Sequence, residues 1–348
     1  MGKRIEQMLN WLMVFMLTFS LFSTAHGKEV GKADAKQSHH APASALAHPC
    51  ASENMPFPLG ADISSRFTGT VHRNDLIAAD DVYKVPQSNV ITFEPGSYSG
   101  WHTHGAMTVI GVAGVGLYQE WGKEAVLIRP GDVVQIPAGV SHFHGATKDS
   151  RFQQIVIYDK DWQAPADLKA HAGAVSAKEY DEANLTAVKN SVAAATPTTP
   201  MDGLVRTQER DATGLRPQDE KFLFAYTPEP FQSPNFNHPV HLGKVLTKPN
   251  EANSPEWVYV VFPKGTYNRW HSHKTGQILI ATDGVGYHQL KGGKLEVLHP
   301  GDVAFCPPGV VHWHGAASES SFAHIAINPE DNHEVTWYDF PTAEYPSK

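Results

Sequence analysis

The chain has little cysteine, no surplus of basic residues and only one long apolar run. Each of these shortages excludes some classes of protein. Its 348 residues include two cysteines, Cys50 and Cys306, so one internal disulfide at most can form, and the sequence does not show whether they pair. Cys306 takes the place of Ile136 in the repeat described below, which favours a small buried side chain. The formal net charge is −8 without a basic stripe, which argues against nucleic acid as a partner.

The one long apolar run lies at the N-terminus. Lys3 and Arg4 precede residues 8–23, which are almost entirely apolar, and small residues follow. This pattern predicts a signal peptide over residues 1–27, because its apolar core is short for a spanning helix and a cleavable segment follows it. An uncleaved membrane anchor is the alternative. We expect the mature protein to be periplasmic or secreted and not bound to a membrane. Residues 28–54, rich in Ala, Ser, His, Lys and Pro, predict a flexible arm.

The rest of the chain repeats itself once. Residues 96–104 return as residues 265–273 after 169 positions, and residues 130–146 return as residues 300–316 after 170 positions. A period of that length is far too long for a solenoid and indicates two copies of a whole domain. Short apolar runs broken by Gly, Pro and Asp predict an all-β fold for each copy.

Each copy carries histidines at the spacing of metal ligands. His102 and His104 in the first copy, and His271 and His273 in the second, are separated by one residue in segments that read as strands. Alternate strand residues face the same way, so both imidazoles of a pair can bind one divalent ion. A third histidine follows after two turns in each copy. These third histidines are His142 and His312.

The second copy resembles the cupin family. Gly265, His271, His273 and Gln277, followed by Gly301, Pro307, Gly309 and His312, are similar to the two cupin motifs. The resemblance implies two tandem jelly-roll barrels, each followed by a short helical or irregular tail. Residues 67–71, 93–96, 101–104, 129–134 and 312–316 further resemble the bacterial hydroxynitrile-lyase-like cupins. That subgroup implies three His and one Gln as ligands of manganese or a similar ion, with Fe, Ni, Zn and Cu as alternatives.

The two copies differ at the fourth ligand. The first copy is one residue shorter between its histidine pair and Gly114, so either Met107 or Thr108 takes the place of Gln277. Neither residue matches the amide oxygen as a ligand, although three neutral imidazoles can still hold zinc, copper or nickel. We therefore expect the second site to bind metal tightly. We expect the first site to bind metal weakly, and a degenerate first site that binds none is the alternative.

A fourth histidine lies two residues after the third in each copy. His314 and His144 should share the inward face with His312 and His142, one pleat from the metal. A neutral imidazole beside a cation can accept or donate a proton, which makes His314 and His144 the catalytic candidates. The matching histidine of the resembling lyases is implicated in proton transfer. A histidine that only orients a ligand is the alternative.

The boundaries follow from the same patterns. We predict a first cupin domain over residues 55–191, including a helical tail, a Pro- and Thr-rich linker over residues 192–220, and a second cupin domain over residues 221–348. Residues 175–180 resemble residues 340–345 at the chain end, so the tail belongs to the repeated unit.

Three functions remain open at this point. The first is a metal-dependent lyase or isomerase acting on a small carbonyl or hydroxy compound, with hydroxynitrile-lyase-like chemistry in the second domain. The second is an iron or copper dioxygenase of the quercetinase type, and the third is a non-enzymatic metal-dependent binding or sensor module. The four second-copy ligands are all neutral, so the ion keeps its full charge and favours Lewis-acid chemistry. The sequence does not identify the substrate, the native metal or the oligomeric state, and a homo-oligomer is compatible with it.

Overall fold

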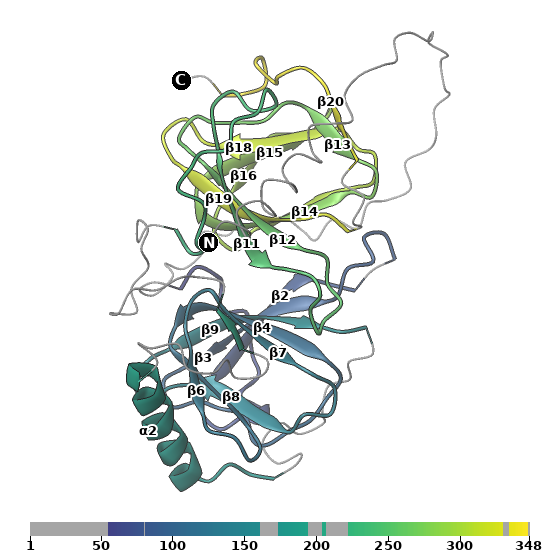
Figure 1. Cartoon of the computed structure of the whole chain (residues 1–348). Helices are drawn as coiled ribbons and strands as arrows, with labels where there is room; N and C mark the ends of the chain where they lie inside the picture. The colour runs from purple at the N-terminus through teal and green to yellow at the C-terminus, as the bar shows by residue number, and fades with distance from the viewer. Residues whose placement is uncertain are drawn as a thin grey trace, which may run out of the picture. The chain divides into compact units, whose positions relative to one another are not determined.

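The computed structural model describes residues 55–79, 81–160, 173–193, 204–206, 222–329 and 334–346. The expected signal peptide, the expected N-terminal arm and Cys50 lie outside these residues, as does most of the expected linker. Within them, β-strands dominate and form two barrels (Figure 1). No helix of the described part of the chain is both long and apolar enough to cross a membrane.

The first barrel is drawn from purple to teal in Figure 1. One of its sheets has the order β1-β2-β3-β9-β4-β7-β10, and the other has the order β6-β5-β8. The described residues also form a 3-10 turn, η1, over Ser64–Arg66 and the helix α2 over Ala177–Ala193. The strands of this barrel are β1 Ala61–Asp62, β2 Val71–Ile77, β3 Ser88–Phe93, β4 Met107–Gly114, β5 Gly116–Glu120, β6 Val126–Ile128, β7 Asp132–Ile136, β8 His142–Ala146, β9 Phe152–Tyr158 and β10 Leu204–Arg206.

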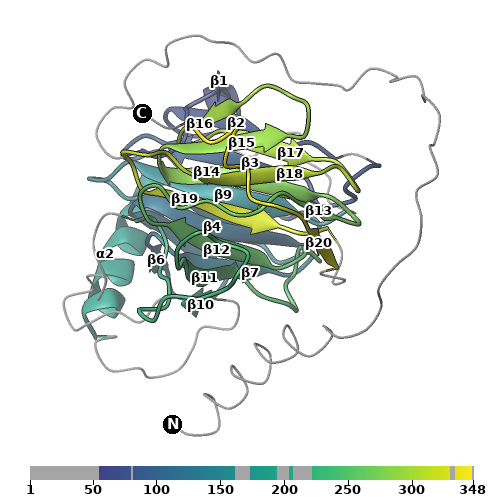
Figure 2. The ribbon, with the colours of Figure 1, turned by 90° about the horizontal axis from the view of Figure 1, so that it is seen from above.

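The second barrel, drawn from green to yellow, repeats this plan. Its sheets have the orders β11-β12-β19-β14-β17 and β16-β15-β18-β13-β20, and the strands of the first sheet lie side by side in Figure 2. The strands are β11 His241–Leu246, β12 Trp257–Phe262, β13 His271–His273, β14 Gln277–Gly284, β15 Gly286–Leu290, β16 Glu296–Leu298, β17 Val303–Cys306, β18 His312–Ala316, β19 Phe322–Ile327 and β20 Val335–Trp337. The predicted fold of two tandem jelly-roll barrels is confirmed.

The central strands are buried on both faces. All six residues of β3 are buried, and its successive side chains belong to different hydrophobic clusters: Val90 to one, Ile91 and Phe93 to another. Because strand side chains alternate, one set fills the barrel interior while the other packs against a second apolar layer. Apolar residues therefore occur on both faces of these strands, and the polar residues among them, such as Asn89 and Thr92, are buried as well.

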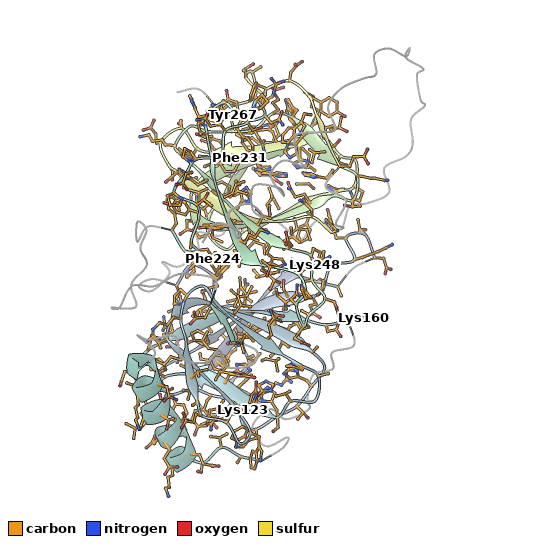
Figure 3. The ribbon with its side chains drawn as sticks, in the orientation of Figure 1. Lys123, Lys160, Phe224, Phe231, Lys248 and Tyr267 are labelled. Carbon is orange, nitrogen blue, oxygen red and sulfur yellow. The ribbon has the colours of Figure 1, made fainter. Side chains whose placement is uncertain are left out.

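Each barrel has a tail that is anchored by a tyrosine. α2 begins with a capping box, in which the Ser176 hydroxyl accepts the Glu179 backbone N–H and Glu179 accepts the Ser176 N–H. The Tyr180 hydroxyl donates to the carbonyl oxygen of Ala146 at 2.7 Å, and its ring stacks on Tyr98 at 4.1 Å between centroids. The second barrel repeats these contacts without a helix. Tyr345 donates to the carbonyl of Ala316 at 3.0 Å and stacks on Tyr267 at 4.3 Å, the latter labelled in Figure 3.

One short piece of the expected linker contributes to the first barrel. β10 pairs antiparallel with β7, with Leu204 opposite Val134 and Arg206 opposite Asp132. This part of residues 192–220 extends a sheet of the first barrel. Its sequence has no alternating apolar pattern long enough to predict a strand, because three residues are too few to show a period of two.

Candidate metal centres

The residues predicted as ligands in the second barrel come together in its interior. His271 and His273 lie on β13, Gln277 begins β14, and His312 begins β18. The strands β13 and β18 pair so that His271 is opposite His312, with the two rings 4.2 Å apart between centroids. All four side chains are buried. Figure 3 draws the side chains of both barrels as sticks.

Backbone carbonyls set the direction of the ring nitrogens. The Nδ1 atom of His271 lies 2.9 Å from the carbonyl oxygen of Arg269, and the Nδ1 atom of His312 lies 3.1 Å from that of Val310. A carbonyl oxygen can only accept, so each Nδ1 carries the proton and donates. In a neutral ring, Nε2 then presents its lone pair to the barrel interior, which is the form that a metal ion requires.

Gln277 is oriented as a ligand in the same way. Its Nε2 donates to the Asn328 Oδ1 at 3.1 Å, so its Oε1 points toward His312 Nε2, 3.3 Å away. Both of these facing atoms carry lone pairs and neither carries a proton, so they cannot hydrogen bond to each other. Two ligands of a first-row ion at about 2.0–2.2 Å lie about 2.8–3.6 Å apart at octahedral to tetrahedral angles. The residues therefore fit a cation shared between them.

The first barrel repeats the histidines with less regular backbone. His102 and His142 form an isolated bridge, and neither His102 nor His104 belongs to a strand, unlike the expected strand segment. The Nδ1 atoms of His102 and His142 each lie 2.9 Å from a carbonyl oxygen, of Gly100 and Val140 respectively. The Nδ1 atom of His104 faces the carbonyl oxygen of Gly105, and the buried Nε2 atom of His142 has no hydrogen-bond partner. Three lone pairs thus converge on a cation position here as well.

The strand register decides which residue replaces Gln277. Met107 pairs with Ile136 on β7, as Gln277 pairs with Cys306 on β17, so Met107 is the structural counterpart. The other candidate, Thr108, points to the opposite face, where its hydroxyl donates to Gln135 at 2.8 Å. A thioether, a soft and weak donor, thus stands where the second barrel has an amide oxygen.

Burial keeps these histidines neutral. Desolvation is the largest cause that lowers the pKa of His271, to about 3, and it lowers the pKa of His312 and of His142 well below the ordinary value. The neighbouring imidazoles add to the effect because each disfavours a second positive charge. At neutral pH the rings can therefore bind a metal ion without first losing a proton.

The fourth histidine lies within reach of the other ligands. The ring nitrogens of His271, His312 and His314 include a set within 4.8 Å of one another, and so do those of His102, His142 and His144. These triplets contain the two catalytic candidates in place of His104 and His273. By ring centroids His273 is as near as His314, at 5.1 Å against 5.3 Å from His271 and 5.6 Å against 6.0 Å from His312, so both imidazoles border the same position.

His314 is clamped by two residues that sequence reasoning missed. Asn268 Oδ1 accepts the His314 backbone N–H at 2.9 Å, which turns its Nδ2 toward His314 Nε2 at 3.0 Å. His314 Nε2 must then accept, so Nδ1 carries the proton and donates to His324 Nε2 at 3.2 Å. The matching His144 has one such partner, Gln154, at 3.1 Å from Nδ1. Comparing the two copies position by position would have shown that His324 replaces Gln154.

An aromatic side chain covers one ligand of the second site. Trp337 on β20 is opposite His271 in the strand register, and the two rings stack at 4.8 Å with an interplanar angle of 28°. The indole is partly exposed. It forms a wall between this ligand and solvent, and no metal-binding motif includes it.

Comparison with known proteins agrees with this architecture. A cupin-domain family model matches residues 89–158 and again residues 258–328. A stretch of 86 residues is 44% identical to an (R)-mandelonitrile lyase of Granulicella tundricola and covers 24% of this chain and 66% of that protein.

Two solved structures are also similar. A cupin-like protein from Thermotoga maritima is 36% identical and matches 33% of this chain and 89% of its own, with a TM-score of 0.31. A mutant oxalate decarboxylase from Bacillus subtilis is 15% identical, with 77% of this chain and 75% of that chain covered and a TM-score of 0.44. With one match of the family model in each barrel, the chain belongs to the cupin superfamily and is a bicupin.

Proposed function

We propose that this bicupin is a metal-dependent lyase or isomerase for a small carbonyl or hydroxy compound, with hydroxynitrile-lyase-like chemistry in the second barrel. The observation that carries this proposal is the buried, all-neutral donor set of the second site, with His314 beside it. The similarity to an (R)-mandelonitrile lyase supports the reaction class.

The donor set favours anionic groups in the site. Neutral ligands leave the charge of a bound divalent ion uncompensated, and such an ion would supply a Lewis acid for a hydroxyl or carbonyl oxygen of the substrate. Each triplet of close ligand atoms in the described part of the chain consists of histidines alone. That differs from the two histidines and one carboxylate typical of iron oxygenases, so it favours the lyase over the dioxygenase. The family resemblance favours manganese.

The histidine network offers a path for a proton. A substrate hydroxyl that replaces the Asn268 amide can donate its proton to His314 Nε2, because that atom carries a lone pair. The proton on His314 Nδ1 already faces His324 Nε2. His324 can therefore share the positive charge. Because both rings are buried and their pKa is lowered, neither ring retains the added proton for long. His144 would play the same part in a weaker first site.

We also infer that the mature protein acts outside the cytoplasm, in the periplasm or beyond the cell. The support is the sequence of residues 1–27, with two basic residues before an apolar core. Mass spectrometry of the protein purified from its native host should find a chain that begins near Lys28. An intact N-terminus on a membrane-bound chain would contradict this inference.

A paired activity and metal assay tests the function. The manganese-loaded protein is screened for cyanohydrin cleavage, keto–enol isomerisation and oxygen consumption. We expect activity in the first or second assay and none in the third. His314→Ala should keep its metal and lose turnover about 10²–10⁴-fold, the usual size of a general acid–base contribution. His144→Ala is the matched control, with a much smaller loss. Oxygen uptake stoichiometric with product would overturn the lyase proposal.

A further inference from the structure

Behind the second site lies a cluster of three polar side chains from three different strands. His288 on β15 and Cys306 on β17 meet across the two sheets of the barrel, with His288 Nε2 3.3 Å from the Cys306 Sγ. Glu296 on β16 binds the other ring nitrogen, with its Oε2 2.6 Å from His288 Nδ1. We propose that Cys306 and His288 form a second metal site, selective for a soft or borderline ion such as Cu⁺ or Zn²⁺.

The distance between the two donor atoms matches a shared ion. With metal–sulfur and metal–nitrogen bonds of about 2.3 and 2.05 Å, a tetrahedral angle separates the two donors by about 3.6 Å. The observed 3.3 Å is within a few tenths of an ångström of that value. The ion therefore requires only a small displacement of either side chain.

The carboxylate prepares the imidazole for this role. A metal-binding histidine almost always donates its second ring N–H to a carboxylate or carbonyl, which fixes the tautomer and makes the free nitrogen more basic. Glu296 can only accept when ionised, so Nδ1 of His288 carries the proton and Nε2 faces the sulfur with a lone pair. His288 is almost completely buried whereas the Glu296 side chain is about half exposed, so the carboxylate keeps contact with water.

The whole cluster is absent from the first barrel. The repeat places Tyr118, Val126 and Ile136 at the matching positions. There the Tyr118 hydroxyl donates to Glu120 of its own strand, and Ile136 has no thiol to offer. Three positions on three strands thus differ together between the two barrels. Residues that serve one function change together in this way, whereas independent drift of core residues would not couple them.

Metal binding at this site exchanges the proton of the thiol for the metal ion. The thiol is protonated in the apo protein, because burial raises its pKa well above the ordinary value. A divalent ion that binds it forms one metal–sulfur bond and releases one proton to solvent. The ring of His288 lies 5.9 Å from that of the ligand His312, so the proposed site adjoins the main centre. It depends neither on the reaction catalysed there nor on the identity of the resident metal.

Cadmium titration of the manganese-loaded protein tests the proposal. A Cys50→Ser background removes the other thiol, so any thiolate-to-cadmium absorption band must come from Cys306. We expect this band to saturate at one equivalent and to be absent from Cys50→Ser/Cys306→Ile, which carries the first barrel's residue. Cadmium in the main centre cannot produce the band, because that centre has no thiolate. Glu296→Gln, a change at a half-exposed side chain that leaves the core intact, should weaken the binding about 10–100-fold.

Two results would overturn the proposal. One is a folded Cys50→Ser protein that shows no thiolate band at cadmium concentrations that fill the main centre. The other is binding of equal strength in the Glu296→Gln variant, since the carboxylate then has no part in the site. Either would leave the Cys306–His288 contact as a hydrogen bond that stabilises the barrel.

Discussion

The two barrels share their histidines and differ in what surrounds them. Three histidines occupy matched positions in both, and each set presents ring nitrogens to the interior. The position of the fourth metal ligand differs, with Met107 in the first barrel and Gln277 in the second. Asn328 orients Gln277, whereas its counterpart Tyr158 donates to Asn89 instead. The ligand and its orienting partner have thus changed together.

That joint change shows how a duplicated site diverges. An amide ligand is useful only when its oxygen faces the metal, and the Asn328 acceptor sets that orientation. When a thioether replaces the amide, no N–H group needs the side-chain acceptor at the position of Asn328. A tyrosine can then occupy that position, as Tyr158 does. The histidines do not depend on either residue, because backbone carbonyls orient them. The fourth ligand is therefore the position where the two barrels can differ while both keep a metal-binding shape.

The largest expected effect is the loss of a histidine ligand. His271→Ala should abolish activity and lower the affinity of the second site by at least the roughly 10–100-fold that changes around a metal site usually cause. His102→Ala, the matched change, should affect the first site alone. Elemental analysis of both purified variants and the wild type measures this. Equal metal loss from the two variants would contradict the unequal sites.

An exchange of the fourth ligands tests the comparison in both directions. Gln277→Met should weaken the second site by about 10-fold or more, because an oxygen donor suited to manganese becomes a soft thioether. Met107→Gln should strengthen the first site, but by less, because Tyr158 is not Asn328. The double change Met107→Gln/Tyr158→Asn should recover more. Competition with a chelator measures each affinity. If the double variant binds no more tightly than Met107→Gln, the orienting role of Asn328 is wrong.

Much of this asymmetry could be predicted from the sequence. The 170-residue repeat predicts two domains, and the cupin motifs predict the ligands of the second site. Two points needed the structure. The choice between Met107 and Thr108 depends on strand register, which a one-residue deletion in the preceding loop leaves undetermined. Asn268 is one of the unspecified positions between Gly265 and His271, and His324 lies beyond the second motif, so the motifs alone do not place either side chain beside His314.

Acid should destabilise the metal-free second barrel more than the first. The pKa of His271 and of His324 is lowered to about 3 by burial, and that of His314 is also far below its ordinary value. Between pH 6.5 and about 3 the unfolded chain therefore binds protons that the folded chain does not, so stability falls as pH falls. Burial lowers the pKa of His142 and His144 in the first barrel as well, but that barrel has Gln154 where the second has the buried His324, so it has one such imidazole fewer at this position.

Hydrogen exchange of the metal-free protein at a series of pH values resolves the two barrels. We expect protection in the second barrel to fall earlier as the pH is lowered from 6.5. Added manganese should move that loss to lower pH, because a bound ion competes with protons for the same nitrogens. Stability that does not change between pH 6.5 and 4 would show that these rings are not held neutral by the fold.

The smallest effect concerns the tails. Tyr180→Phe and Tyr345→Phe each delete one hydroxyl donor to a buried strand carbonyl, of Ala146 and Ala316 respectively. Tyr180 is buried, so its carbonyl loses a partner that water does not replace, and the cost should be about 1–3 kcal/mol. Tyr345 is partly exposed, so water can take the place of its hydroxyl and the cost should be about 0.5–1.5 kcal/mol. Chemical denaturation of the two variants compares them. A larger loss from Tyr345→Phe would mean that the irregular tail, without a helix, holds its barrel more firmly than α2 holds the first.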